Sequence, residues 1–151
     1  MLKRIFEKKK KENPNSNILV ISLLIHAAKI DENYTEVEKK IIIKAIMHLN
    51  KINLSEAEKL LKLSEKKEEE SNQIVEFTRE IKKYPMEFRL KIIEIIWKIV
   101  YSDDTSDNYE SNLIRRICGL LYISDKDSGI IKTKVQNYIK KIWHTLLMKP
   151  A

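Results

Sequence analysis

Apolar residues recur along this chain at the three- and four-residue spacing that is typical of helices. The spacing predicts helices over residues 17 to 30, 36 to 50, about 56 to 70, 72 to 83, 86 to 102, about 108 to 121 and about 125 to 148. Two of them, residues 17 to 30 and 86 to 102, are apolar on almost every side, which is typical of buried helices. We therefore expect an all-α fold of about seven helices with these two at its centre.

Helix starts and inward faces can also be predicted. Capping boxes are expected at Thr35 with Glu38, Ser55 with Glu58 and Asp107 with Glu110, and Ser124 or Asp125 is expected to cap the last helix. One expected stripe, in the second helix, consists of Val37, Ile41, Ala45 and Leu49. The inward residues expected in the last helix are Ile131, Val135, Tyr138, Ile142 and Leu146.

Composition agrees with a helical fold. Two glycines and three prolines are too few for the many turns of a β-sandwich or for a glycine-rich nucleotide-binding loop. The net charge is +7, and residues 1 to 12 carry six basic and two acidic side chains. The other charges alternate in sign, so no specific nucleic-acid partner is expected. We divide the chain into a basic, flexible N-terminal segment, residues 1 to 16, and one helical domain, residues 17 to 151.

The domain contains an internal repeat. A shift of 72 residues places Asp31 on Asp103 and Glu38 on Glu110, and the apolar positions around them also correspond. Each half then consists of a buried helix, an acidic loop and two capped helices, with residues 72 to 83 as a connector. The repeat predicts two three-helix halves related by a pseudo-twofold axis.

Two stretches of sequence carry the clearest motif. AAKIDENYTEVEKKI (residues 27 to 41) and IVYSDDTSDNYESNL (residues 99 to 113) each place a Glu seven residues after an Asp, between two apolar helices. This pattern resembles the tellurite-resistance protein B-like (TerB-like) family over about residues 17 to 147. The chain departs from the family pattern after each Asp, where it has Glu32 and Asp104 in place of glycine.

The resemblance implies one acidic site that holds a divalent cation across the pseudo-twofold axis. Its members are the paired residues of the two loops: Asp31, Glu38, Asp103 and Glu110. Oxygen ligands suit hard ions such as Ca²⁺, Mg²⁺ or Mn²⁺. The alternative is a structural protein-interaction domain with no metal, in which the acidic residues serve as helix caps.

Other chemistry is not expected. His26, His48 and His144 fall in three helices without a paired ligand spacing, so they predict no histidine metal site. Cys118 lies among apolar residues and is expected in the core. A metal-dependent hydrolase would need an open ion position and a general base, and the sequence identifies neither. We therefore predict a non-enzymatic module.

Partners and localisation follow from charge and from the resemblance. A protein partner is expected, in a stress-response or membrane-associated complex. Residues 1 to 12 place Leu2, Ile5 and Phe6 among basic side chains, so weak contact with an anionic membrane stays open beside a solubilising tail. A single cysteine and a poor signal-peptide pattern favour a cytoplasmic protein, with peripheral placement at the inner membrane face left open.

Overall fold

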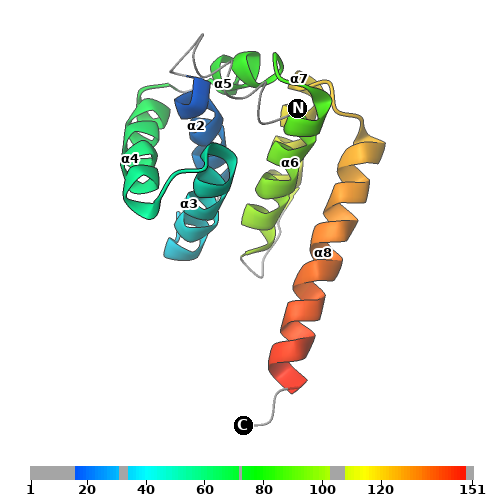
Figure 1. Cartoon of the computed structure of the whole chain (residues 1–151). Coiled ribbons are helices and arrows are strands. Elements are labelled where there is room, and N and C mark those ends of the chain that lie inside the picture. The colour runs from blue at the N-terminus through cyan, green and yellow to red at the C-terminus, as the bar shows by residue number, and fades with distance from the viewer. Residues whose placement is uncertain (1–15, 31–33, 72, 103–107, 149–151) are drawn as a thin grey trace.

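Helices are the regular elements throughout the described part of the chain. The structure, a computed structural model, describes residues 16 to 30, 34 to 71, 73 to 102 and 108 to 148 (Figure 1). Its helices are α2 (Ser16–Ala28), α3 (Glu36–Asn50), α4 (Leu54–Glu70), α5 (Ile74–Ile81), α6 (Met86–Tyr101), α7 (Asn108–Leu120) and α8 (Asp125–Met148). The all-α prediction is confirmed. The predicted basic segment lies outside the described residues, except for Ser16 at the start of α2.

α2 and α6 form the centre of the fold. α2 packs against α3, α4, α5, α6 and α7, and α6 packs against α2, α3, α7 and α8. Leu23 and Ile25 of α2 and Ile92 and Ile96 of α6 are completely buried. Burial of each such side chain stabilises the folded state by about 1.5–3 kcal/mol. The prediction that the two apolar helices are central is therefore confirmed.

Helix contacts recur between the two halves of the chain. α2 packs against α3 and α4 as α6 packs against α7 and α8, and α3 contacts α6 as α7 contacts α2. The turn after the second helix of each half contains a left-handed residue other than glycine, Lys51 at φ 53° and Tyr122 at φ 57°. Equivalent helix contacts and equivalent turns in the two halves are what the internal repeat predicts. The pseudo-twofold axis itself stays a prediction.

The inward face of α3 differs from the predicted stripe. Glu38, Ile42 and Ile46 are buried, whereas Val37 is 55% exposed. α3 contacts α2, α4 and α6, so its buried face is wide and centred on the two buried isoleucines. Three residues of the predicted stripe lie at the edge of this face and are partly buried: Ile41, Ala45 and Leu49.

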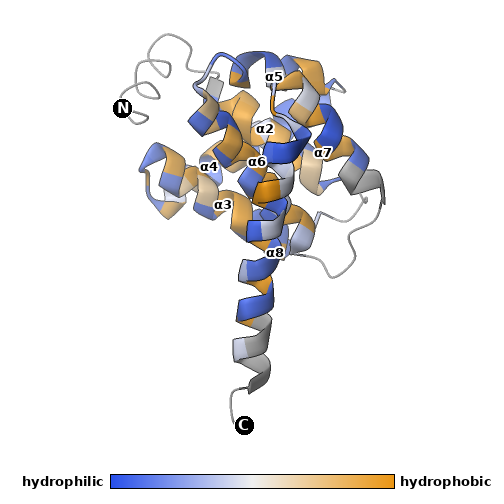
Figure 2. Ribbon diagram, turned by 90° about the vertical axis from the view of Figure 1, so that its right-hand side faces the viewer, coloured by the Kyte–Doolittle hydropathy of each residue, from blue (hydrophilic) through white to orange (hydrophobic). Residues whose placement is uncertain are grey.

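The last helix is only partly covered by the domain. Val135 is buried and Ile131 is partly buried, but Tyr138 is 59% and Ile142 is 42% exposed. The prediction that both of these point inward is wrong, because α8 continues past the end of the body against which it packs (Figures 1 and 2). The side chain of Leu146 lies outside the described residues.

The start of α4 also differs from the prediction. Its cap is Asn53, whose side chain accepts a hydrogen bond from the backbone N–H of Glu56 at 2.9 Å. Ser55 and Glu58 both lie inside the helix, so the capping box predicted there is wrong. Asn is as good a cap as Ser and stands one residue before the helix, which is why it takes this role. At the start of α8, Ser124 caps as expected and accepts from the N–H of Asp127 at 3.1 Å.

The cap at Asn53 can be tested by mutation. Asn53→Ala should lower the free energy of unfolding by about 1 kcal/mol, because a backbone N–H at the helix start loses its acceptor. Ser55→Ala is the matched control and should have little effect. Urea unfolding followed by circular dichroism measures both. The opposite order of effects would show that α4 begins at the predicted box.

Polar contacts hold the first turns of α8 against α6. The Glu94 carboxylate binds Nζ of Lys91 at 2.9 Å and Nζ of Lys134 on α8 at 3.0 Å, and Nε1 of Trp97 donates to Oγ of Ser128 at 3.3 Å. Burial acts to raise the pKa of Glu94, but the two lysines outweigh it and lower the pKa to about 2. Glu94 is therefore charged in the folded protein even in mild acid.

This ion-paired carboxylate makes stability depend on pH. A lowered pKa in the folded state stabilises the protein above about pH 4.3, the ordinary pKa of glutamate, and the contribution is lost as pH falls towards 2. Glu94→Gln should therefore be less stable by about 1 kcal/mol at neutral pH, since the lysine partners are partly exposed. The difference from the unmutated protein should shrink in acid. Urea unfolding across the acid range measures it, and a difference that does not change with pH would contradict this assignment.

Candidate functional site

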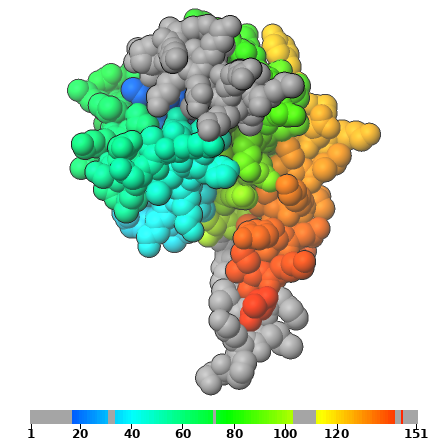
Figure 3. All heavy atoms as spheres, in the orientation of Figure 1, coloured from blue at the N-terminus to red at the C-terminus, as the bar shows by residue number. Residues whose placement is uncertain are grey.

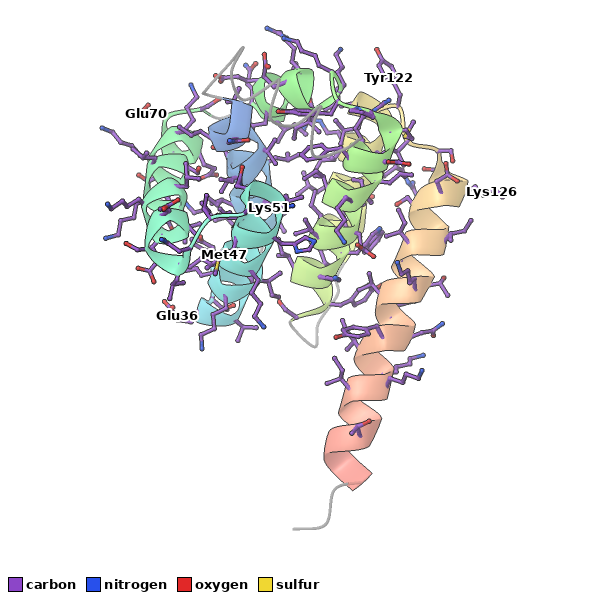
Figure 4. All side chains as sticks on the ribbon, in the orientation of Figure 1. Glu36, Met47, Lys51, Glu70, Tyr122 and Lys126 are labelled. Atoms are coloured by element: carbon purple, nitrogen blue, oxygen red, sulfur yellow. The ribbon has the colours of Figure 1, made fainter. Side chains whose placement is uncertain are left out.

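The two acidic loops are attached at one end of the domain. The start of α3, marked by Glu36 in Figure 4, and the end of α6 lie at the same lower end. α3 contacts α6, and α2 contacts both of them. The helices that flank the two loops are therefore neighbours, as an acidic site shared by the loops would require.

Glu38 is the one predicted ligand whose side chain the structure describes. Its residue is only 3% exposed. Oε1 of Glu38 accepts from the backbone N–H of Thr35 at 2.8 Å and from the Thr35 hydroxyl at 3.0 Å, while Oγ1 of Thr35 accepts from the Glu38 N–H at 3.1 Å. The predicted capping box is confirmed. This carboxylate therefore closes the start of α3, whatever else it binds.

The other three predicted ligands are not placed by the structure. Asp31 and Asp103 lie outside the described residues, as does Asp107 of the third predicted capping box. Glu110 lies in α7, but its side chain is outside the described part. Among the described side chains, no group of three or more His, Cys, Asp or Glu is arranged to hold a metal ion. The described part thus supplies one of the four carboxylates, and the metal site stays a prediction.

Tyr34 links the first acidic loop to α3 and α4. Nζ of Lys39 lies 4.9 Å and Nζ of Lys29 lies 5.7 Å from the centre of its ring. Its hydroxyl oxygen is buried and has no hydrogen-bond partner of good geometry within the described ranges. Burial, and then the negative charge of Glu65, raise the pKa of Tyr34 well above its ordinary value. Tyr34 is therefore neutral in the folded protein at physiological pH.

A second polar cluster joins the end of α2 to α4. The Glu68 carboxylate binds Nζ of Lys29 at 2.9 Å and Nδ1 of His26 at 3.3 Å. The charged run over residues 66 to 70 is typical of a solvated helix end, yet the Glu68 side chain is only 10% exposed. The sequence signal was weak, because a helix end rich in Lys and Glu does not show which carboxylate faces a neighbouring helix.

The opposite end of the same half carries a surface cavity of about 440 Å³. It lies between the first turn of α2, the end of α4, marked by Glu70 in Figure 4, and α5. Ile18, Leu19 and Leu63 line it together with charged residues, and Lys67 binds Glu76 across it at 2.9 Å. The cavity has no cluster of catalytic groups among its described residues. It lies away from the start of α3, which Glu36 marks in Figure 4.

The thiol, indole and imidazole side chains are the remaining groups with chemistry of their own. Cys118 is buried in the core, and burial raises the pKa of its thiol, so it is a poor nucleophile. Trp97 is buried as well. His26 belongs to the Glu68 cluster, His48 is exposed, and the side chain of His144 lies outside the described part.

The described part of the chain has seven helices, two of them central and apolar. Together with the two acidic motifs of the sequence, this arrangement defines the class of helical modules that the motifs indicate. The family model described as "Tellurite resistance protein TerB" matches residues 17–133. The chain belongs to the TerB family. No curated protein and no solved structure matches it. Within the described ranges, no helix is long and apolar enough to cross a membrane.

The buried state of Tyr34 can be measured by tyrosine absorbance during a pH titration. Because the pKa of Tyr34 is raised, Tyr34→Phe should leave the tyrosinate signal of the folded protein near pH 10 unchanged. In denaturant, where all six tyrosines ionise, the same variant should lose one sixth of the tyrosinate absorbance. A loss of signal in the folded protein would show that Tyr34 ionises freely.

Proposed function

We propose that this TerB-family chain is a non-enzymatic helical module that binds a divalent cation through its two acidic loops. The ligands of the proposed site are one Asp and one Glu from each loop: Asp31, Glu38, Asp103 and Glu110. The ion is Ca²⁺, Mg²⁺ or Mn²⁺, because the ligand atoms are all carboxylate oxygens. The module acts with a protein partner in a stress-response or membrane-associated complex.

The recurrence of the Asp-to-Glu step in both halves carries this proposal. A capping box needs the Glu at the third helical position but has no need of an Asp seven residues before it. The contacts of α3 with α6 and of α2 with α7 support a common position for the two loops. Four carboxylates held together repel one another unless a cation or a proton lies among them.

The Glu38 carboxylate has two possible roles, as the cap of α3 and as a ligand of the cation. In the alternative function, a structural interaction domain without metal, the carboxylate serves only the Thr35 cap. The observed hydrogen bonds to Thr35 favour this alternative for one oxygen of Glu38. A test must therefore remove the cap and the charge separately.

Two substitutions separate them. Glu38→Gln keeps an acceptor for the Thr35 N–H but removes the negative charge, whereas Thr35→Ala weakens the cap by about 1 kcal/mol and keeps the charge. Thermal melts with and without millimolar Ca²⁺ or Mg²⁺ measure both. We expect the unmutated protein and Thr35→Ala to gain stability with the ion, and Glu38→Gln and Asp103→Asn to lose most of that gain.

Asp103→Asn has a further expected effect. Removing one of four repelling charges should leave the ion-free protein equally stable or more stable, which loss of a cap would not do. Absence of a cation-dependent shift in the unmutated protein would overturn the metal proposal and leave the structural domain. A shift that persists in all three variants would place the ion elsewhere.

A further inference from the structure

α8 is attached to the domain over only part of its length. Its contacts with α6 include the ion pair of Lys134 with Glu94 and a hydrogen bond of 2.8 Å from Nε2 of Gln136 to Oη of Tyr101. Ile139 is the last apolar side chain of α8 that packs against the core within the described part. The helix nevertheless continues to Met148, and Figure 3 shows its later turns projecting below the other coloured parts of the molecule.

The projecting turns carry apolar residues on one face. Tyr138 and Ile142 are four residues apart and are both exposed. They continue the line of Ile131 and Val135, which pack towards the body, and the sequence keeps the same spacing with Leu146. An exposed apolar stripe that is continuous with a packed interface is typical of a surface that binds another protein or a membrane.

The charged side chains of these turns are all lysines. The sequence has no acidic residue after Asp127, and its five later charged residues are Lys132, Lys134, Lys140, Lys141 and Lys149. Lys132 lies over the Trp97 ring and Lys134 binds Glu94. Lys140 and Lys141 are exposed, and neither has an ion-pair partner among the described residues. Positive charge beside an exposed apolar stripe fits an anionic surface with an apolar layer beneath it.

We propose that the projecting part of α8, residues 138 to 148, binds the surface of an anionic phospholipid membrane. A second copy of this chain fits less well, because pairing two such helices would bring lysines together with no carboxylates to balance them. In a membrane the apolar stripe enters the acyl boundary while the lysines reach the headgroups. The inference rests on the proposed function only for its membrane-associated setting and not for cation binding.

The test is sedimentation of the full chain with lipid vesicles in a metal chelator. Vesicles of phosphatidylcholine with phosphatidylglycerol should bind the protein, and vesicles of phosphatidylcholine alone should bind it far more weakly. The double variant Lys140→Ala and Lys141→Ala should bind about 30-fold more weakly, since each lysine near an anionic surface contributes about a fivefold factor. Tyr138→Ser combined with Ile142→Ser should also reduce binding.

α4 provides matched controls. Lys59→Ala with Lys62→Ala removes the same charge from exposed positions, and Leu63→Ser removes an exposed apolar side chain. Neither change should reduce vesicle binding by more than a factor of about two. These residues are distant from the projecting part of α8, so salt screens most of their attraction to the membrane. Circular dichroism confirms that each variant is folded.

Several results would overturn the proposal. They are equal binding to both kinds of vesicle, no binding to either, unchanged binding by both α8 double variants, or loss of binding only when residues 1 to 12 are deleted. The last of these would assign the membrane contact to the N-terminal segment. Because the chelator removes divalent ions, failure of the cation proposal would not alter this result.

Discussion

The fold depends on the burial of two helices against each other. α2 and α6 are apolar around most of their circumference, so most of each helix must be enclosed by other helices. α3, α4 and α5 enclose α2, while α7 and α8 pack against α6. The two central helices contact each other, and the start of α3 and the end of α6 lie at the same end of the domain (Figure 4). Core formation thus positions the described helix ends that flank the candidate site.

Much of this architecture can be predicted from the sequence. The continuous apolar runs over residues 17 to 30 and 86 to 102 identify the core helices, because no amphipathic surface helix has that pattern. Thr35 and Glu38 identify the start of α3 correctly. At α4 the same rule fails, since several capping residues stand close together and local spacing cannot choose between Asn53 and Ser55.

Side-chain exposure is harder to predict, since it depends on which helices are neighbours. An apolar stripe on α8 predicts an inward face, yet only its first turns meet α6, so Tyr138 and Ile142 remain exposed. Glu68 shows the reverse case, a carboxylate in a charged run that is drawn into contact with α2. Tyr34 is not one of the paired motif residues, and only the tertiary structure places it beside Glu65. For the acidic site, the sequence shows that the Asp-to-Glu step recurs in both halves. Only the fold shows that the helices flanking the two loops are neighbours.

Amide NMR of the full chain during titration with Ca²⁺ or Mg²⁺ tests the central claim most directly. If one cation is held by both loops, amide signals from residues 31 to 38 and from residues 103 to 110 should shift together and saturate at the same ion concentration. Signals from the end of α8 should stay unchanged. Shifts confined to one loop, or no saturable shifts in either, would contradict a shared cation site in this TerB-family protein.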